Sequence, residues 1–371
     1  MNKPQSSDFN QILENFRKQA YSERDKGDRF ERLMQRYLQT EPTYKDRFSD
    51  VWLWTEFPCR TDFAGGKDLG IDLVCRTKSG DYWAVQCKFY DENTQISKEA
   101  VDTFLSTSGK QFTDSITRQT TQFAERLWIS TSENWSNNAE ETIRNQQPQV
   151  NKIGLAALEN SVVDWERIAS GISGEKALQP KKQIRPHQQT ALEHTHRHFQ
   201  NHDRGKLIMA CGTGKTFTSL KIAEHETAGK GLILFLVPSI ALMGQTLREW
   251  SAQSEKPVNS VCICSDATVS QTKAKREDKS GDTIEDLPLP ASTDVQTILR
   301  QFKQIRNYDC GGMTVVFSTY QSIERISAIK NHFANFLTIK SSTSIILKTV
   351  RMRLLNMQEI CRKLPMPVFR S

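Results

Sequence analysis

An acid, an amide and a lysine lie within one short stretch of the chain, at a spacing that can build a metal-dependent site. Asp72 is followed, after thirteen residues, by Gln86-Cys-Lys88. The segment 70–89 reads as two short strands joined by a turn at Ser79-Gly-Asp81, and strand side chains alternate between faces. Asp72, Gln86 and Lys88 are therefore predicted to converge on one side of a hairpin.

The opposite face of this hairpin is apolar. It carries Ile71, Leu73 and Cys75 on the first strand and Trp83, Val85, Cys87 and Phe89 on the second. A carboxylate and an amide oxygen can hold Mg²⁺, and a lysine beside them can orient a water molecule or stabilise a phosphate. Metal-assisted phosphodiester hydrolysis requires these groups. The alternative is an ordinary solvated hairpin face.

The segments Asp68-Leu-Gly-Ile-Asp72 and Trp83-Ala-Val-Gln-Cys-Lys-Phe-Tyr90 resemble the core of the PD-(D/E)xK nucleases, in their Mrr-like restriction endonuclease branch. In that branch Gln commonly replaces an acid. The resemblance implies an α/β restriction-endonuclease-like domain, double-stranded DNA as substrate and Mg²⁺ as cofactor. It assigns Asp72 and Gln86 to the metal and Lys88 to the water or the phosphate charge. Asp68 either faces the same site or belongs to a turn.

A helix predicted upstream of the hairpin supplies a further acid. Residues 28–38 place apolar side chains at helical spacing, with Asp28 as candidate N-cap and Pro42 as the stop. Glu31 lies beside this apolar stripe. In the resembled family such a helix lends a Glu near the metal, which would make Glu31 a catalytic residue. The alternative is a surface ion pair between Glu31 and an Arg at helical spacing.

The rest of the first domain, residues 1–168, has a usual domain size. We expect a helix capped by Ser97, a strand at 126–130, a polar helix over 137–147, a strand over 153–158 and a closing segment at 163–168. Residues 169–182 have the Gly, Pro and Lys composition of a linker.

A phosphate-binding loop is predicted in the second domain. Leu207-Ile-Met-Ala-Cys-Gly-Thr-Gly-Lys-Thr216 reads as an apolar strand, a Gly-rich turn and a helix start. Gly212, Thr213 and Gly214 let backbone N–H groups close around phosphates, Lys215 reaches the terminal phosphates, and Thr216 ligates Mg²⁺. Met209 stands where the strict pattern has Gly. The segment nevertheless resembles the ATP-binding loop of superfamily 2 helicases and restriction-enzyme motors; a chance Gly-rich turn is the alternative.

Other segments resemble the same motor. Residues 232–237 are all apolar, as in a parallel sheet buried on both faces, and 313–322 read as a further strand and its loop. Arg185-Pro-His-Gln188 resembles the motif whose Gln reads adenine, which implies that Gln188 contacts ATP. Together they predict a partial RecA-like lobe with a parallel sheet over 183–326, interrupted by a polar insertion. A nuclease followed by such a lobe resembles the N-terminal part of single-chain, type ISP restriction enzymes.

One part of such a motor is missing from the sequence. No Asp-Glu-x-His box, whose carboxylates hold Mg²⁺ and activate water, follows the strand that ends at Ser318-Thr-Tyr320. Glu285 and Asp286 lie in a Pro- and Ser-rich stretch instead. We therefore expect ATP binding with negligible hydrolysis.

Residues 327–371 carry eight Lys or Arg and one acid, which accounts for the whole formal net charge of +7. Our hypothesis is out-of-frame translation after a frameshift that truncated a longer enzyme; the alternative is a basic DNA-binding arm. Two functions then remain. The chain is an Mg²⁺-dependent DNA endonuclease fused to an ATP-binding lobe of a restriction system, or an inactive remnant that only binds DNA or ATP.

Histidine and cysteine suggest no further site. His194, His198 and His202 are four residues apart, but no Cys or carboxylate set completes a zinc shell with them or with His187. Eight cysteines without paired spacing indicate a reducing, cytoplasmic location and no disulfide framework. No apolar run approaches the roughly 18 residues of a membrane span, so we expect no membrane contact.

Overall fold

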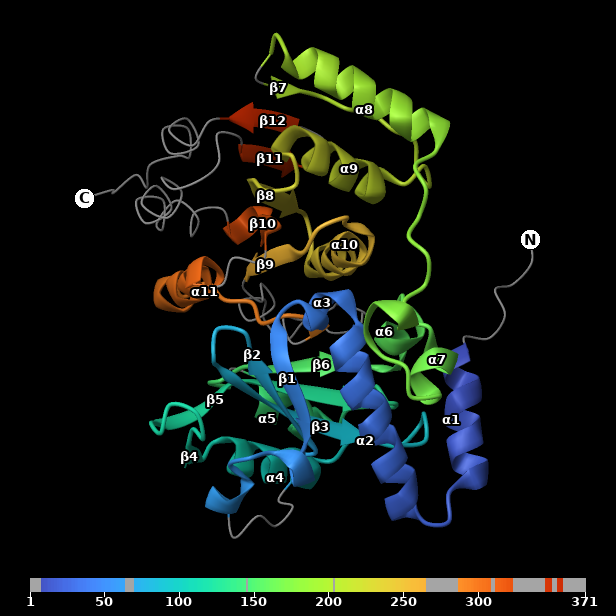
Figure 1. Cartoon of the computed structure of the whole chain (residues 1–371), viewed down its shortest axis with the longest axis vertical. Coiled ribbons are helices and arrows are strands. Elements are labelled where there is room, and N and C mark those ends of the chain that lie inside the picture. The colour runs from blue at the N-terminus through green and yellow to red at the C-terminus, as the bar shows by residue number, and fades with distance from the viewer. Residues whose placement is uncertain are drawn as a thin grey trace. The chain divides into compact units, whose positions relative to one another are not determined.

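The computed structural model describes residues 8–63, 70–144, 146–202, 204–264, 286–307, 311–322, 344–348 and 352–355. The chain divides into two compact units, Met1–Pro180 and Lys181–Ser371, and each has its own six-stranded sheet (Figure 1). The α/β class predicted from the sequence is confirmed. None of the helices in the described ranges is long and apolar enough to cross a membrane.

The first sheet runs in the order β1-β2-β3-β5-β4, with β6 also paired to β5. The pairs β1–β2, β2–β3 and β4–β5 are antiparallel, whereas β3–β5 and β5–β6 are parallel. The predicted hairpin is the pair β2–β3, and Gly80 turns it with a φ of 97°. The strands are β1 (Phe48–Leu53), β2 (Leu73–Thr77), β3 (Tyr82–Lys88), β4 (Gln111–Thr113), β5 (Thr120–Ser130) and β6 (Val150–Ile153).

Helices cover both faces of this sheet. One face receives α2, where Phe30 stacks on Phe89 with ring centroids 5.3 Å apart. The other face receives α4, where Phe104 meets Trp128 edge-on at 5.9 Å. The elements are α1 (Asp8–Gln19), α2 (Glu23–Thr40), α3 (Pro42–Lys45), η1 (Trp54–Glu56), η2 (Arg60–Asp62), α4 (Lys98–Ser108), α5 (Asn137–Ile143), α6 (Leu155–Glu159), α7 (Trp165–Ala169) and η4 (Gly174–Ala177).

Several expected element boundaries in this unit are wrong. The polar helix expected over 137–147 ends at Ile143, and the strand expected at 126–130 begins at Thr120. Helix α2 begins five residues before Asp28, because the Ser22 hydroxyl accepts a hydrogen bond from the Asp25 N–H at 3.1 Å and caps it. The strand expected over 153–158 ends at Ile153, and α6 follows at once. Its Leu-Ala-Ala-Leu-Glu sequence consists of strong helix formers, and Gly154 starts the turn.

The predicted linker packs partly on the first unit. The Lys45 ammonium lies 3.0 Å from a Glu175 carboxylate oxygen, and the Gly174 N–H donates to the Thr40 hydroxyl at 2.9 Å. The Asp164 N–H also donates to the Ala177 carbonyl at 2.8 Å. These contacts place η4 within the unit that ends at Pro180.

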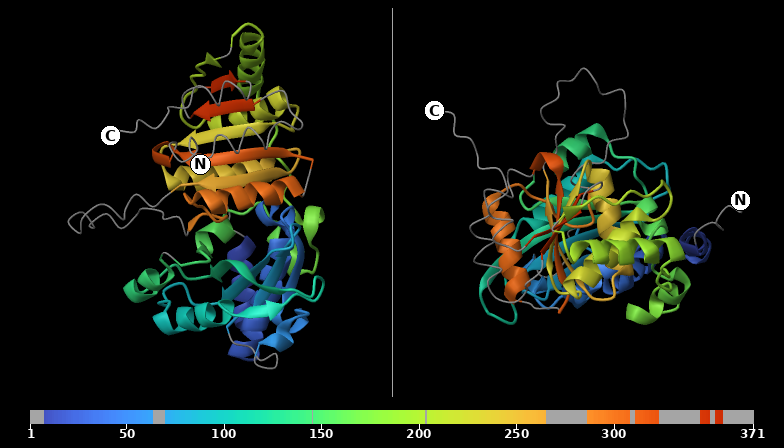
Figure 2. Two further views of the ribbon diagram at one scale, coloured as in Figure 1. Left: turned by 90° about the vertical axis from the view of Figure 1, so that its left-hand side faces the viewer. Right: turned by 90° about the horizontal axis from the view of Figure 1, so that it is seen from above.

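The second sheet runs in the order β7-β12-β11-β8-β10-β9. Strands β9, β10, β8 and β11 are parallel, and β12 and β7 add an antiparallel edge; Figure 2 shows these strands side by side. The strands are β7 (Arg204–Gly205), β8 (Leu232–Val237), β9 (Val258–Ile263), β10 (Met313–Thr319), β11 (Ser344–Lys348) and β12 (Met352–Leu355). The last two lie in the predicted basic tail.

Helices lie on both faces of this sheet as well, which is why β8 is apolar throughout. On one face Trp250 of α10 contacts Phe235 and Phe317 at 5.1 and 6.0 Å. On the other face α11 packs against β9, and its Ile298 and Phe302 belong to one apolar cluster with the leucines of β8. The helices are α8 (Pro186–Phe199), α9 (Lys215–Thr227), α10 (Ile240–Gln253) and α11 (Val295–Asn307), with η8 (Tyr320–Ser322) after β10.

The apolar strand predicted just before the phosphate-binding loop is wrong. Residues 206–210 have irregular backbone, and Ile208 is 78% exposed. The neighbouring ladder between β7 and β12 is only two residues long. Residues 206–210 therefore pair with no strand in the described part of the sheet, and an apolar run needs such a neighbour to become a buried strand.

Candidate active site

Asp72 and Gln86 are in direct contact, Asp72 just before β2 and Gln86 in β3. Asp72 is 6% exposed and Gln86 is 1% exposed. The Gln86 amide nitrogen Nε2 donates to Oδ2 of Asp72, and the Cys87 backbone N–H donates to the same oxygen at 2.7 Å. The structure thus brings together the acid and the amide that strand alternation was expected to join.

Backbone contacts hold this pair in place. The Asp72 N–H donates to the Val85 carbonyl at 2.9 Å, and the Asp72 carbonyl accepts from the Trp54 N–H at 2.8 Å. Gly70 has a φ of 90°, and a Cβ there would lie 3.4 Å from Oε1 of Gln86. The amide oxygen therefore points toward Gly70. A half-turn of the amide would present that oxygen beside the Asp72 carboxylate, as a shared cation requires.

Lys88 and Glu31 lie near the same strand end. The charges of Lys88, Glu31 and Asp72 all act on the Cys87 thiol. Burial raises the pKa of this thiol, the carboxylates of Asp72 and Glu31 raise it further, and the Lys88 ammonium lowers it. Lys88 is half-buried at the end of β3 and forms no ion pair with any carboxylate of the described residues. Glu31 is half-buried on α2, the helix that packs against β3. Asp72, Glu31 and Lys88 are thus all close enough to this buried thiol to act on it electrostatically.

Asp68 and the two preceding glycines, Gly65 and Gly66, lie outside the described residues, as does Glu285 in the second unit. The roles assigned to Asp72, Gln86, Lys88 and Glu31 remain predictions.

The predicted phosphate-binding loop forms a tight turn into α9. Gly212 and Gly214 have φ values of 76° and 80°, and Gly214 is the N-cap of the helix. The Thr213 hydroxyl donates to the Ala210 carbonyl at 2.8 Å. The exposed Lys215 ammonium lies 3.3 Å from the Ala210 carbonyl and at the same distance from that of Met209. Thr216 lies in the first turn of α9, whose N–H groups can receive an anion.

Gln188 lies against this loop. Its amide nitrogen donates to the Thr213 carbonyl at 3.0 Å, and its amide oxygen accepts from the Arg185 N–H at 2.9 Å. The side chain is buried, and a Cβ at Gly214 would lie 2.5 Å from the Gln188 Nε2. The structure therefore places Gln188 with the predicted nucleotide-binding residues. An adenine base would have to replace one of these two hydrogen bonds.

Sequence reasoning missed one group of side chains. His196 on α8 lies beside His225 and Glu226 on α9, and their ligand atoms are within 4.8 Å of one another. Neither His196 nor His225 belongs to the histidines spaced four residues apart, and no spacing signals a contact between residues 29 positions apart. Only the packing of α8 on α9 brings them together.

Comparison with known families assigns the two units separately. Residues 39–175 match a restriction endonuclease family, Mrr_cat_2, and include Asp72, Gln86 and Lys88 but not Glu31. Residues 181–346 match the family of the Type III restriction enzyme res subunit. This second match includes Gln188 and the phosphate-binding loop, and ends within the predicted tail. No curated protein matches the chain.

Comparison with solved structures includes two Type ISP enzymes. The "ATP-dependent Type ISP restriction-modification enzyme LlaBIII bound to DNA" is 34% identical over 86% of this chain, with a TM-score of 0.68. A "nuclease-deletion mutant of the Type ISP restriction-modification enzyme LlaGI in complex with a DNA substrate mimic" is 41% identical over 41% of this chain, with a TM-score of 0.33. The chain spans 19% of the first protein's length and 14% of the second.

The family matches and the similarity to a solved structure therefore indicate the same domain organisation. This chain joins an Mrr-type restriction endonuclease domain to a helicase-like res-subunit domain, the organisation that it shares with part of the Type ISP restriction-modification enzymes.

Proposed function

We propose that this chain is a Mg²⁺-dependent DNA endonuclease whose second unit binds ATP. The contact between the buried carboxylate of Asp72 and the buried amide of Gln86 carries the proposal. These two oxygen-bearing side chains are almost sealed from water and lie directly against each other. They suit a site that receives a hard cation.

The donor set fits Mg²⁺. Asp72 supplies a carboxylate oxygen, and Gln86 supplies an amide oxygen after its side chain turns; Mg²⁺ prefers such oxygen ligands and keeps several waters. When bound, the ion would lower the pKa of a coordinated water and offset charge on the scissile phosphate. Glu31, on the helix beside β3, would act on the same water or bind the ion's outer waters.

Lys88 would act on the phosphate. Its ammonium lies at the strand end that carries Gln86 and forms no ion pair with a described carboxylate, so it is available to an anion. There it would orient the attacking water or stabilise the negative charge on the phosphate oxygens as the P–O bond breaks. Removing one preorganised charge of this kind typically costs 10²–10³-fold in rate.

Double-stranded DNA is the proposed substrate. The first family match is to restriction endonucleases, and the structure of LlaBIII is that of an enzyme bound to DNA. The chemical groups at Asp72, Gln86 and Lys88 are those that phosphodiester hydrolysis requires.

ATP is the proposed ligand of the second unit. Gly212, Thr213 and Gly214 form the turn, Lys215 would exchange two backbone carbonyls for the terminal phosphates, and Thr216 would ligate the Mg²⁺ of the nucleotide. Gln188 would contact the adenine. No Asp-Glu-x-His box follows β10 in the sequence, so we propose binding with negligible hydrolysis by this chain.

The test is cleavage of supercoiled plasmid by the purified chain with Mg²⁺, with and without ATP. Asp72→Asn removes one charge at the site, and Asp102→Asn removes one charge from a half-exposed aspartate of α4 as a matched control. We expect cleavage by the unchanged chain and by the control variant but not by Asp72→Asn. Loss in both variants, or no cleavage by the well-folded chain, would instead support a remnant that only binds DNA or ATP.

A further inference from the structure

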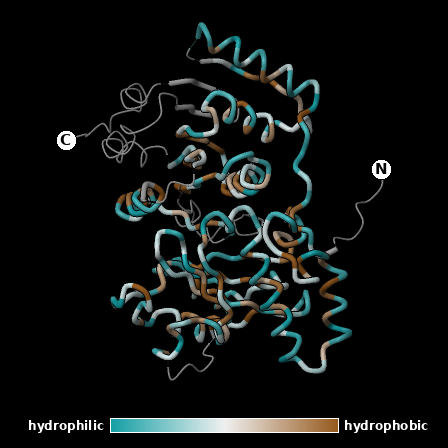
Figure 3. Tube along the Cα trace, in the orientation of Figure 1, coloured by the Kyte–Doolittle hydropathy of each residue, from teal (hydrophilic) through white to brown (hydrophobic). Residues whose placement is uncertain are grey.

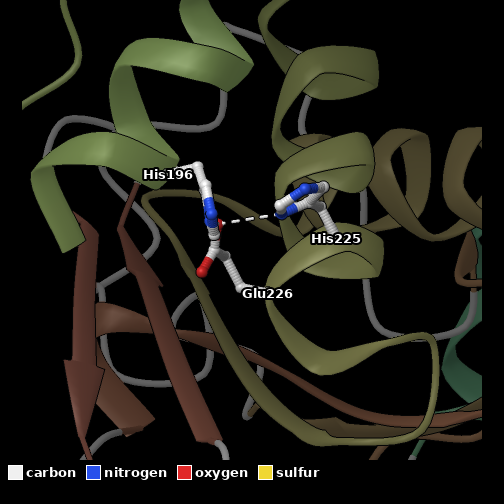
Figure 4. A group of neighbouring side chains, drawn as sticks. All are labelled: His196, His225 and Glu226. Atoms are coloured by element: carbon white, nitrogen blue, oxygen red, sulfur yellow. Dashed lines mark hydrogen bonds and ion pairs between the residues drawn. The ribbon is translucent and has the colours of Figure 1, made fainter. Parts of the chain in front are cut away.

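The C-terminal ends of α8 and α9 bring together three side chains of the types that bind zinc. Figure 4 shows His196 of α8 facing His225 and Glu226 of α9. The Nδ1 atom of His196 lies 3.0 Å from Oε1 of Glu226, and the Nδ1 atom of His225 lies 3.1 Å from the same oxygen. One carboxylate oxygen thus lies against two imidazole nitrogens, and the two rings meet at 4.5 Å between centroids.

These distances are close to those of a zinc shell. Zinc binds imidazole nitrogen and carboxylate oxygen at about 2.0–2.2 Å, so neighbouring ligands of a tetrahedral ion are separated by about 3.3 Å. The three donor atoms here lie within 4.8 Å of one another. The two nitrogen–oxygen distances already lie close to this spacing. Small side-chain movements would arrange the two nitrogens and the oxygen around an ion and leave the fourth position for water.

Burial also suits an ion that enters from solvent. The Glu226 side chain is 9% exposed, whereas the side chains of His196 and His225 are each 45% exposed. The carboxylate is therefore fixed in the packing between the two helices, and the imidazoles reach it from the water-facing side. Two histidines and one glutamate form one of the commonest ligand sets of zinc sites with an open position.

The side-chain amide of Gln200 can accept a hydrogen bond from His196 when that histidine binds a metal. The Gln200 Nε2 lies 3.5 Å from the Nε2 of His196. With a metal on Nδ1, the proton of the neutral ring moves to Nε2, which then needs an acceptor. A half-turn of the Gln200 amide supplies its oxygen, and such partners orient metal-binding histidines in many sites.

The apolar packing of helix α8 on α9 is limited. Its fully buried residues are Gln188 and Thr195, both polar, whereas Ala191, Leu192 and Phe199 on the same face are only half-buried. The helix is largely hydrophilic along its length (Figure 3), so it gains little from the hydrophobic effect. A metal that joins His196 to His225 and Glu226 would supply the missing attachment to α9.

We propose that His196, His225 and Glu226 bind one zinc ion that fastens α8 to α9. None of these three residues belongs to the proposed nuclease site or to the nucleotide loop, so zinc binding can be measured without DNA cleavage or ATP binding. Metal binding to the folded state alone raises its stability, and at 100 times the dissociation constant the melting temperature should rise by about 5–10 °C.

The experiment titrates the chelator-treated full chain with Zn²⁺ by calorimetry and with Co²⁺ by visible absorption. We expect one ion per chain, Co²⁺ d–d bands of a four- or five-coordinate site, and a Zn²⁺-dependent rise in melting temperature. His225→Ala and Glu226→Gln should each weaken binding by about 100-fold or more. His194→Ala, at an exposed position of α8, and Cys211→Ser, at an exposed thiol, should bind Zn²⁺ as the unchanged chain does.

Two results would overturn the proposal. One is the absence of Zn²⁺ binding at micromolar concentration by the folded chain. The other is binding that persists in Glu226→Gln or disappears in Cys211→Ser, which would assign the ion to other ligands. Glu226→Gln keeps an oxygen that can accept the histidine hydrogen bonds, so its fold, checked by circular dichroism, should survive when its metal affinity does not.

Discussion

The Gln86 side chain donates a hydrogen bond to the Asp72 carboxylate across the β2–β3 hairpin, at a place where neither residue is more than 6% exposed. Because an amide has both a donor and an acceptor, it can stabilise the carboxylate when no ion is present and face a cation after a half-turn. A second carboxylate in place of the amide would lack the donor. This difference gives Gln86 a testable role.

Replacing Gln86 with glutamate should make the stability of the first unit depend on Mg²⁺. Two buried carboxylates in contact repel each other and lose the amide donor, so we expect a loss of about 1–3 kcal/mol in the free energy of unfolding without metal. Adding Mg²⁺ should restore most of the lost free energy of unfolding. Urea unfolding in EDTA and in Mg²⁺ measures the free energy of unfolding without and with the ion. Gln86→Met is the control, and its stability should not respond to Mg²⁺; an equal response in both variants would argue against an ion at this position.

Two buried thiols should make the first unit less stable in alkali. Burial raises the pKa of Cys75 and of Cys87, with Asp72 and Glu31 adding to the shift at Cys87. In the unfolded chain these thiols ionise near their ordinary pKa, about 8.5, but in the folded chain they stay protonated. Their contribution to stability is therefore complete below that pH and is lost above it, by about 1.4 kcal/mol per pH unit for each thiol.

Unfolding measured between pH 8 and 10 tests this slope. Cys75→Ala should reduce the fall in the free energy of unfolding across this range, and Cys75→Ala with Cys87→Ala should reduce it further. Other groups that titrate in alkali contribute equally to all three proteins, so the comparison isolates the thiols. A slope that is the same in the unchanged chain and in the double variant would contradict the assignment.

Two glycines of the nucleotide loop should respond differently to alanine. A Cβ at Gly214 would lie 2.5 Å from the Gln188 amide nitrogen, whereas a Cβ at Gly212 meets nothing within 4 Å. Both have positive φ, so both variants carry backbone strain of about 1–2 kcal/mol. Gly214→Ala must also displace Gln188. We expect it to weaken binding of a fluorescent ATP analogue by tenfold or more beyond Gly212→Ala, and equal losses would place Gln188 away from the nucleotide.

The sequence predicted the elements whose pattern is local. Alternation along 70–89 predicted that Asp72 and Gln86 share one side, because a strand has a fixed period of two and the turn at Gly80 sets the register. The buried strand β8 was equally clear from its uninterrupted apolar run. The cap of α2 was misplaced because several polar residues between Ser22 and Asp28 can cap a helix, and only tertiary contacts decide which one does.

Features that depend on packing escaped prediction. The apolar run at 206–210 has strand-like composition, but a strand forms only where a neighbouring strand can pair with it. The Glu31 charge acts on Cys87 together with those of Asp72 and Lys88 because α2 packs on β3, a contact that no spacing encodes. The group at His196, His225 and Glu226 likewise arises from two helices that are separate in sequence.

Single-turnover plasmid cleavage over a series of Mg²⁺ concentrations tests the central claim most directly, because it separates residues that hold the ion from a residue that acts on the phosphate. Lys88→Ala should lower the maximal rate by about 10²–10³-fold with little change in the Mg²⁺ concentration at half-maximal rate. Asp72→Asn should show no saturation with Mg²⁺ in the range where the unchanged chain saturates. Cleavage by Asp72→Asn with the Mg²⁺ dependence and rate of the unchanged chain would contradict the account.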